Sequence, residues 1–332
     1  CAHRTSQFGA RERRLMQPRK APRRTLHGVL LLDKPLGWTS NDALQKTKGI
    51  LRAEKGGHTG TLDPLATGLL PLCFGAATKF SQASLDADKR YVATLKLGQR
   101  TTTGDGEGAV TEERAVQTSM AAIVAACRRF TGAIDQVPPM HSALKHEGRA
   151  LYDYARAGIE IERAARRITI HAIDIVRWHG EELVLDVRCS KGTYIRTLAE
   201  DIGAALGCGA HLSALRRTGS GSLSVEQSIT IEALAALSEA DRDGLLLPPD
   251  VLVAGWPDVH LQDDEAGRFL CGLRRRVLLA DAPAVRVYRQ PPMAPDDDLT
   301  PKLRAFLGTA HITAGELIAD RLLSPLEVQD SP

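Results

Sequence analysis

The sequence has no Cys-x-x-Cys pair, no long hydrophobic run and no strong net charge. Six cysteines without such a pair argue against both a zinc ribbon and a disulfide scaffold, and reduced thiols of a cytosolic protein are the simplest account. No apolar run approaches the ~18 residues of a membrane-spanning helix, and no signal-peptide pattern opens the sequence. We therefore expect a globular cytoplasmic protein without membrane association.

Positive charge is concentrated at the N-terminus. Residues 1–24 hold eight Lys or Arg and one Glu, a net charge of +7, and because the whole chain carries +3 the remaining residues carry −4. A body of this charge requires a local basic patch for any RNA contact. Residues 1–27 are expected to form a disordered tail, which either only keeps the protein in solution or adds a nonspecific attraction to phosphate.

The length of 332 residues predicts two domains. The first part mixes alternating or apolar strand patterns with amphipathic helices. Its expected strands lie at residues 29–32, 68–74, 90–97, 168–178, 182–188 and 211–217, and its expected helices at 76–83, 118–130 and 231–237. After residue 258, short apolar runs separated by turns are typical of a small β-barrel.

The segment GGHTGTLDPLATGLLPL, residues 56–72, places a single carboxylate in a turn-rich stretch. Its glycines and Pro64 exclude a regular helix, and Pro64 biases the backbone of Asp63 toward an extended or turn conformation. Such a position presents a carboxylate to a substrate. Asp-Pro pairs in loops also commonly do no more than close a turn, so the residues alone leave both interpretations open.

This segment resembles the catalytic motif of the TruB-type tRNA pseudouridine synthases, the enzymes that isomerise uridine-55 in the T loop of tRNA. Four more stretches match motifs of this family in the same order, and together they cover about residues 28–323. They are LLDKPLGWTSND (31–42), KRYVATLKLGQRT (89–101), CSKGTYIRTLAEDIG (189–203) and GAHLSALRRTGSG (209–221).

The resemblance implies an α+β fold with a mixed, mainly antiparallel sheet flanked by helices. It implies a catalytic domain at residues 28–252, with an RNA-binding insertion at about 136–165, and a PUA-like RNA-binding β-barrel at 258–325. The implied partner is the T-stem-loop of tRNA. We expect a monomer with no obligatory protein partner, and no metal or cofactor, because an isomerisation involves no net group transfer.

Three residues match the catalytic positions of the family. Asp63 is implied as the attacking acid, Arg196 as the guanidinium that keeps it ionised and oriented, and Tyr91 as the plate on which the flipped base stacks. Without the motif, Tyr91 at a strand start is typical of a core residue, and Arg196 near a helix start is typical of a surface residue. Tyr194 and Arg196 are two residues apart, so both face one site only if a helix begins there.

Other positions match supporting roles. Tyr194 and Leu215 are implied to line the uracil pocket, Lys34 to shape the catalytic turn, and Asp105 to join the ionic network around it. His58 is implied to hold the flipped nucleotide or the RNA backbone. Further candidates for phosphate contacts are Lys145, with His141, His146 and Arg149 beside it, and the pair Arg216 and Arg217. The chain departs from the family pattern at Thr102 and Ala76, where acids are common.

Two alternatives remain at this point. One is a protein that only binds or folds RNA, in which the aromatic and basic groups act without the acid. The other is a metal-dependent hydrolase that uses His58, Asp63 and Asp105, although His58 and Asp63 alone fall short of the three protein ligands usual at a catalytic zinc.

Overall fold

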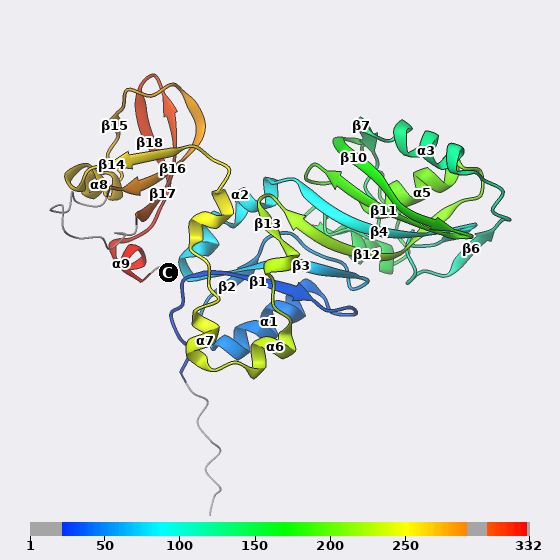
Figure 1. Ribbon diagram of the computed structural model, residues 1–332, viewed down its shortest axis with the longest axis horizontal. Coiled ribbons are helices and arrows are strands. Elements are labelled where there is room, and N and C mark those ends of the chain that lie inside the picture. Colours follow the sequence, from blue (N-terminus) through cyan, green and yellow to red (C-terminus); the bar gives the residue numbers. More distant parts are fainter. Residues whose placement is uncertain (1–21, 291–303, 331–332) are drawn as a thin grey trace, which may run out of the picture.

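The computed structural model describes residues 22–290 and 304–330. Most of the basic tail predicted at residues 1–27 therefore lies outside the described residues. A large sheet with helices is followed by a smaller sheet near the C-terminus (Figure 1). No helix in the described ranges combines the length and the apolar character needed to cross a bilayer.

The large sheet has nine strands in the order β1-β3-β12-β4-β11-β10-β7, with β2 beside β3 and β13 beside β12. All pairs are antiparallel except β12 with β3, so the predicted mixed, mainly antiparallel sheet is confirmed. The strands are β1 (Gly28–Lys34), β2 (Gly56–His58), β3 (Ala66–Phe74), β4 (Lys89–Leu97), β7 (Gly132–Gln136), β10 (Arg166–His179), β11 (Glu182–Cys189), β12 (Ala210–Ser220) and β13 (Leu223–Ser224).

Helices flank this sheet, as expected. They are α1 (Ser40–Leu51), the 3₁₀ helix η1 (Gly75–Phe80), α2 (Ser81–Asp86), α3 (Met120–Arg129), α4 (Leu151–Arg156), α5 (Ile195–Ala205), η2 (Val225–Gln227), α6 (Ile231–Ala236), α7 (Glu239–Asp243) and η3 (Pro249–Val253). Leu198 and Ile202 of α5 pack with Leu185 and Leu212 of the sheet in one core, and Leu44 of α1 belongs to a second. Two small hairpins complete this part: β5 (Gln99–Thr101) with β6 (Val110–Glu113), and β8 (Lys145–His146) with β9 (Arg149–Ala150).

The second sheet has five strands in the order β14-β16-β17-β18-β15, and it curls upon itself (Figure 1). Its strands are β14 (Asp258–Leu261), β15 (Arg275–Arg276), β16 (Ala282–Arg289), β17 (Ala305–Thr313) and β18 (Glu316–Leu322), with helices α8 (Asp263–Leu270) and α9 (Pro325–Gln329). An α+β fold with a curled C-terminal β-sheet is what the resemblance predicted.

Side chains from both sheets meet at η1 and η3. The rings of Phe80 and Phe306 lie 5.1 Å apart, and the Tyr288 hydroxyl donates a 2.6 Å hydrogen bond to Asp250. Tyr288 and Phe306 also belong to a hydrophobic core that includes Val29 of β1. The C-terminal sheet is thus packed on the large sheet, and the predicted domain boundaries stay a prediction.

Candidate active site

The loop that carries Asp63 joins β2 to β3 and is tied down at both ends. The backbone N–H of Leu62 donates to the Ser40 hydroxyl at 2.8 Å, and this hydroxyl donates back to the Leu62 carbonyl at 3.1 Å. The N–H of Gly37 donates to the Pro64 carbonyl at 2.8 Å. Asp63 lies outside helices and strands, as its glycines and Pro64 predict, and its side chain is 44% exposed.

Helix α5 begins at the point that the spacing of its two candidate residues requires. Tyr194 is the N-cap residue, in an extended conformation with φ −101° and ψ 109°, and Arg196 lies in the first turn. The helix begins at Ile195, after a turn in which Gly192 adopts a φ of +77°. Tyr194 and Arg196 therefore face one cavity.

Arg196 is a buried guanidinium shared between two carboxylates. Its Nη2 atom lies 2.9 Å from Asp63 Oδ2, and its Nη1 atom lies 3.4 Å from Asp105 Oδ2. It also donates to the carbonyls of His141 at 2.5 Å and Thr103 at 3.4 Å. Asp105 is buried, whereas Asp63 is partly exposed, so this network fixes the guanidinium and leaves Asp63 open toward solvent.

Five residues with a predicted catalytic or pocket-lining role line one cavity of about 540 Å³. Its walls come from the Asp63 loop, β4, β12, the start of α5 and residues 142–144 of the insertion. The five are Asp63, Tyr91, Tyr194, Arg196 and Leu215. A partly exposed carboxylate, a paired guanidinium and two phenol rings thus surround a space of the size that small ligands occupy.

Burial keeps both phenols of this cavity protonated. It raises the pKa of Tyr91, where Arg217 opposes the shift, and it also raises the pKa of Tyr194. The two rings are therefore neutral plates and hydrogen-bonding groups at neutral pH.

The side-chain amide of Gln136 fixes the backbone of Tyr194. It accepts from the Tyr194 N–H at 2.8 Å and donates to the Tyr194 carbonyl at 3.1 Å, and Gln136 is buried at the end of β7. This residue was not among the predicted site residues. Gln136 stands at the start of a proline-containing loop, and nothing in the sequence around it indicates a hydrogen bond to Tyr194, which is far away in the chain.

Four predicted residues lie around the cavity without lining it. Lys34 is fully buried and donates to the carbonyls of Pro35 at 3.0 Å and Trp38 at 2.6 Å. Burial lowers the pKa of Lys34 to about 8, against the opposing attraction of Asp63. Asp105 lies behind Arg196, and Lys145 is exposed on the β8–β9 hairpin.

His58 is the fourth of these residues. It lies in β2, opposite Leu72 of β3, and its buried Nδ1 atom has no hydrogen-bond partner. Burial, and then Arg217, lowers the pKa of His58, so the imidazole is neutral at neutral pH. In residues 22–290 and 304–330, no group of three or more His, Cys, Asp or Glu side chains is placed to hold a metal ion, so His58, Asp63 and Asp105 do not assemble the alternative metal site.

Arg217 corrects a prediction. It was a candidate for a phosphate contact, but only 1% of it is exposed, and it lines the cavity from β12. The strand period of two gave the signal, because it places Arg217 on the same face as Leu215, which was expected to wall the pocket. Lys89, also buried at the cavity, was likewise not predicted.

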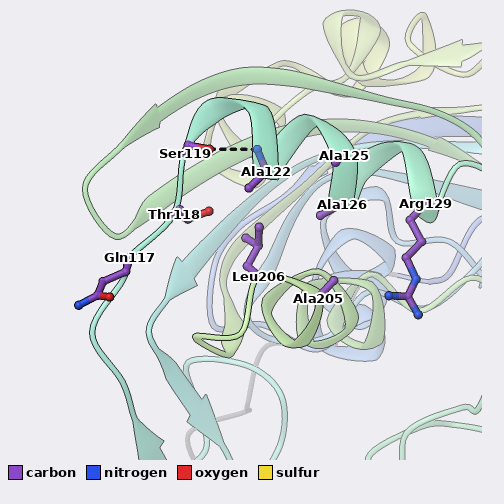
Figure 2. Close-up of a pocket in the computed structure, with 9 residues that line it drawn as sticks. All are labelled: Gln117, Thr118, Ser119, Ala122, Ala125, Ala126, Arg129, Ala205 and Leu206. Atoms are coloured by element: carbon purple, nitrogen blue, oxygen red, sulfur yellow. Dashed lines mark hydrogen bonds between the residues drawn. The ribbon is translucent and has the colours of Figure 1, made fainter.

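A second hollow, of about 570 Å³, lies between α3 and the C-terminal end of α5 (Figure 2). Four of its nine lining residues are alanines, and Arg129 at one end is its one charged lining residue. The Ser119 hydroxyl on this lining accepts from the Ala122 N–H at the start of α3, and no lining residue is a carboxylate or a histidine that could activate a hydroxyl. The cavity at Asp63 is therefore the better candidate.

Comparison with known proteins identifies the family of this chain. The family model described as the TruB family pseudouridylate synthase N-terminal domain matches residues 48–195, and that of the tRNA pseudouridylate synthase B C-terminal domain matches residues 196–254. The tRNA pseudouridine synthase B of Verminephrobacter eiseniae is 57% identical over 93% of this chain and 92% of its own. That of Ralstonia pickettii is 54% identical over 94% of this chain and 99% of its own.

Solved structures share the fold. A crystal structure of a Cbf5–Nop10–Gar1 complex contains a chain with a TM-score of 0.69 and 25% identity, covering 92% of this chain and 87% of that one. A chain of an H/ACA RNP bound to a substrate RNA containing 2′-deoxyuridine has a TM-score of 0.67 at 25% identity, with the same coverage. The match over nearly the whole length, with the five motif residues around one cavity, means that the chain belongs to the TruB family of pseudouridylate synthases, which are isomerases.

Proposed function

We propose that this protein converts uridine-55 of the tRNA T loop to pseudouridine, by flipping the target base into the cavity and attacking it or its sugar covalently with Asp63. The observation that carries the proposal is the 2.9 Å ion pair of the partly exposed Asp63 with the buried Arg196, beside two phenol rings. The relatives are tRNA pseudouridine synthases B, which supports tRNA as the substrate.

The cavity suits a flipped uracil. Tyr91 holds the base by its face and leaves the ring edges free, while Tyr194 and Leu215 close the pocket. The guanidinium of Arg196 keeps the Asp63 carboxylate charged and aimed, as a nucleophile requires. The bond between N1 and C1′ breaks, the uracil rotates, and C5 bonds to C1′. C5 loses a proton and N1 gains one, so atoms balance and the reaction requires no cofactor.

The insertion at about 136–165 is placed to hold the T-stem-loop. Residues 142–144 line the cavity, and the exposed β8–β9 hairpin follows directly. Lys145 and Arg149 on this hairpin, with His146, are proposed to contact phosphates, and His58 is proposed to hold the flipped nucleotide or the RNA backbone. The curled C-terminal sheet is proposed as a PUA-like module that contacts RNA elsewhere.

We further propose that the protein works as a monomer in the cytoplasm. Four of the described cysteines are buried free thiols (Cys73, Cys127, Cys189 and Cys208) and Cys271 is an exposed one, which suits a reducing compartment.

Tritium release from tRNA carrying [5-³H]uridine tests the proposal. Turnover should be lost in Asp63→Asn and kept in the control Glu181→Gln, which removes an exposed carboxylate in the β10–β11 turn. A tRNA with cytidine at position 55 checks the target. Turnover retained by Asp63→Asn would contradict the assignment, and a parent protein that binds tRNA without releasing tritium would favour the RNA-binding alternative.

A further inference from the structure

Three cations are buried next to the cavity without a carboxylate partner. The exposed fractions of Lys34, Lys89 and Arg217 are 0%, 8% and 1%. In the part of the chain that the structure describes, none of the three forms an ion pair, and their bonds go to neutral acceptors instead. Lys89 donates to the carbonyls of Ser84 at 2.9 Å, Leu85 at 3.0 Å and Ala87 at 2.5 Å.

Two of these cations and Tyr91 lie in one row across four strands. Lys34 of β1 pairs with Gly68 of β3, Gly68 pairs with Arg217 of β12, and Arg217 pairs with Tyr91 of β4. Partners in adjacent strands point to the same face of a sheet. Gly68 makes the row possible, because a Cβ atom there would lie 2.3 Å from the Arg217 carbonyl oxygen.

An unpaired buried charge is costly to a folded protein, and such charges are concentrated at functional sites. Burial lowers the pKa of Lys34 and of Lys89 to about 8, as expected for buried ammonium groups that nearby negative charges do not fully neutralise. Both remain mainly protonated at neutral pH, and Arg217 stays charged. The result is a positive potential, little screened by water, directed at the cavity that Arg217 and Lys89 line.

Arg217 also lies beside Tyr91. It donates to the carbonyls of Leu69 at 2.7 Å and Gly60 at 3.3 Å, and its charge opposes the rise that burial causes in the pKa of Tyr91. Arg217 therefore fixes the turn three residues before Asp63 and places its charge next to the aromatic plate.

We propose that a cationic floor, formed by Arg217 and Lys89 in the cavity lining and by Lys34 behind it, stabilises the negative charge that the uracil ring takes up while its bond to C1′ is broken. The inference rests on the proposed function. As that bond breaks, its electron pair stays with N1 and spreads to the ring carbonyl oxygens, so the detached uracil is an anion until C5 bonds to C1′ and N1 is protonated. Fixed cations in a dry site stabilise such charge without reorganisation.

The test compares two leaving groups. T-stem-loop RNA carries either uridine or 5-fluorouridine at the target position, and single-turnover consumption of the parent nucleoside is followed by digestion and mass spectrometry. Because fluorine stabilises a negative ring, the second substrate depends less on the cationic floor. Arg217→Gln should slow uridine about 10²- to 10³-fold and 5-fluorouridine at least about tenfold less. An equal loss on both substrates would reduce Arg217 to a structural role and overturn the proposal.

Two further variants keep the test decisive. If Arg217→Gln melts below the assay temperature, Lys89→Met replaces it in the test. We expect a smaller loss of rate with the same difference between the two substrates, and an equal loss of rate on both substrates would again overturn the proposal. Arg216→Gln is the matched control, because the adjacent Arg216 pairs with Asp33 outside the cavity lining and should affect both substrates alike. Parent and Asp63→Asn proteins on the uridine substrate separate a failure of this inference from a failure of the proposed function.

Discussion

Asp105 holds Arg196 from the buried side, at 3.4 Å, while Asp63 contacts the same guanidinium from the open side at 2.9 Å. Asp105 also accepts from the Thr103 hydroxyl at 2.5 Å and the Glu107 N–H at 3.1 Å, so its carboxylate is fixed by three groups. The arginine is thereby placed before any substrate arrives. This arrangement makes Asp105 a positioning residue for the ion pair of Asp63.

Asp105→Asn should reduce both stability and turnover. Removing one of its two carboxylate partners leaves the buried Arg196 paired with the partly exposed Asp63 alone, at a cost of about 1–3 kcal/mol in the free energy of unfolding. We also expect kcat to fall about tenfold, because Arg196 loses the partner that positions it and its guanidinium is then less well oriented toward Asp63. Urea unfolding and tritium release measure the two effects, with Glu181→Gln as the control. A variant as stable as the parent would show that the pair is not coupled to the fold.

Arg196→Lys should fail to restore activity. The guanidinium makes four contacts, with Asp63, Asp105 and the carbonyls of His141 and Thr103, and an ammonium has neither the fork nor the reach for all of them. We expect kcat/KM for tRNA to fall about 10²-fold or more, mainly in kcat. A loss of less than about threefold would mean that any cation suffices there.

Gln136→Leu should loosen Tyr194 without touching the cavity itself. The change removes the two hydrogen bonds to the Tyr194 backbone and leaves its N–H unpaired, which costs about 1–3 kcal/mol, while its carbonyl keeps the bond from the Leu198 N–H at 3.1 Å. Denaturation and steady-state kinetics measure the effect, with Gln45→Leu on the exposed face of α1 as the control. Unchanged kinetics would argue that the pocket does not depend on this backbone anchor.

Gly68→Ala should destabilise the fold strongly. Gly68 has a φ of +96°, which side chains rarely adopt, and the added Cβ would meet the Arg217 backbone at 2.3 Å. We expect a loss of at least ~2 kcal/mol in the free energy of unfolding. Gly57→Ala is the matched control, because nothing lies within 4 Å of a Cβ there. Equal melting temperatures for the two variants would contradict the tight approach of β3 to β12.

Stability should rise with pH above about 8 through Lys34. Burial lowers the pKa of this residue from 10.5 to about 8, with Asp63 and Glu107 opposing and Arg217 reinforcing the shift. Between these pH values the unfolded chain binds more protons than the folded one, so the free energy of unfolding increases with pH. Relative to Lys34→Met, the parent should gain about 1–2 kcal/mol between pH 8 and 10 in urea titrations. A parallel pH profile in the two proteins would contradict it.

The strands, the non-helical Asp63 loop and the shared direction of Tyr194 and Arg196 could be predicted from the sequence, because each depends on local pattern or on the start of one helix. Contacts between residues of distant strands could not be predicted in this way. Arg217 meets Tyr91 and Gln136 meets Tyr194 through sheet register and chain packing, which no local pattern encodes.

Helix α2 lies between the two sheets (Figure 1). Phe80, directly before it, packs against Phe306 of the C-terminal sheet, and carbonyls in the last turn of α2 accept from the ammonium of Lys89 at the cavity. The six residues of α2 therefore join the C-terminal sheet to the cavity. If RNA contacts both the C-terminal sheet and the cavity, as proposed, the distance between them selects the length of the RNA stem. A stem of the wrong length would place its target nucleotide outside the cavity.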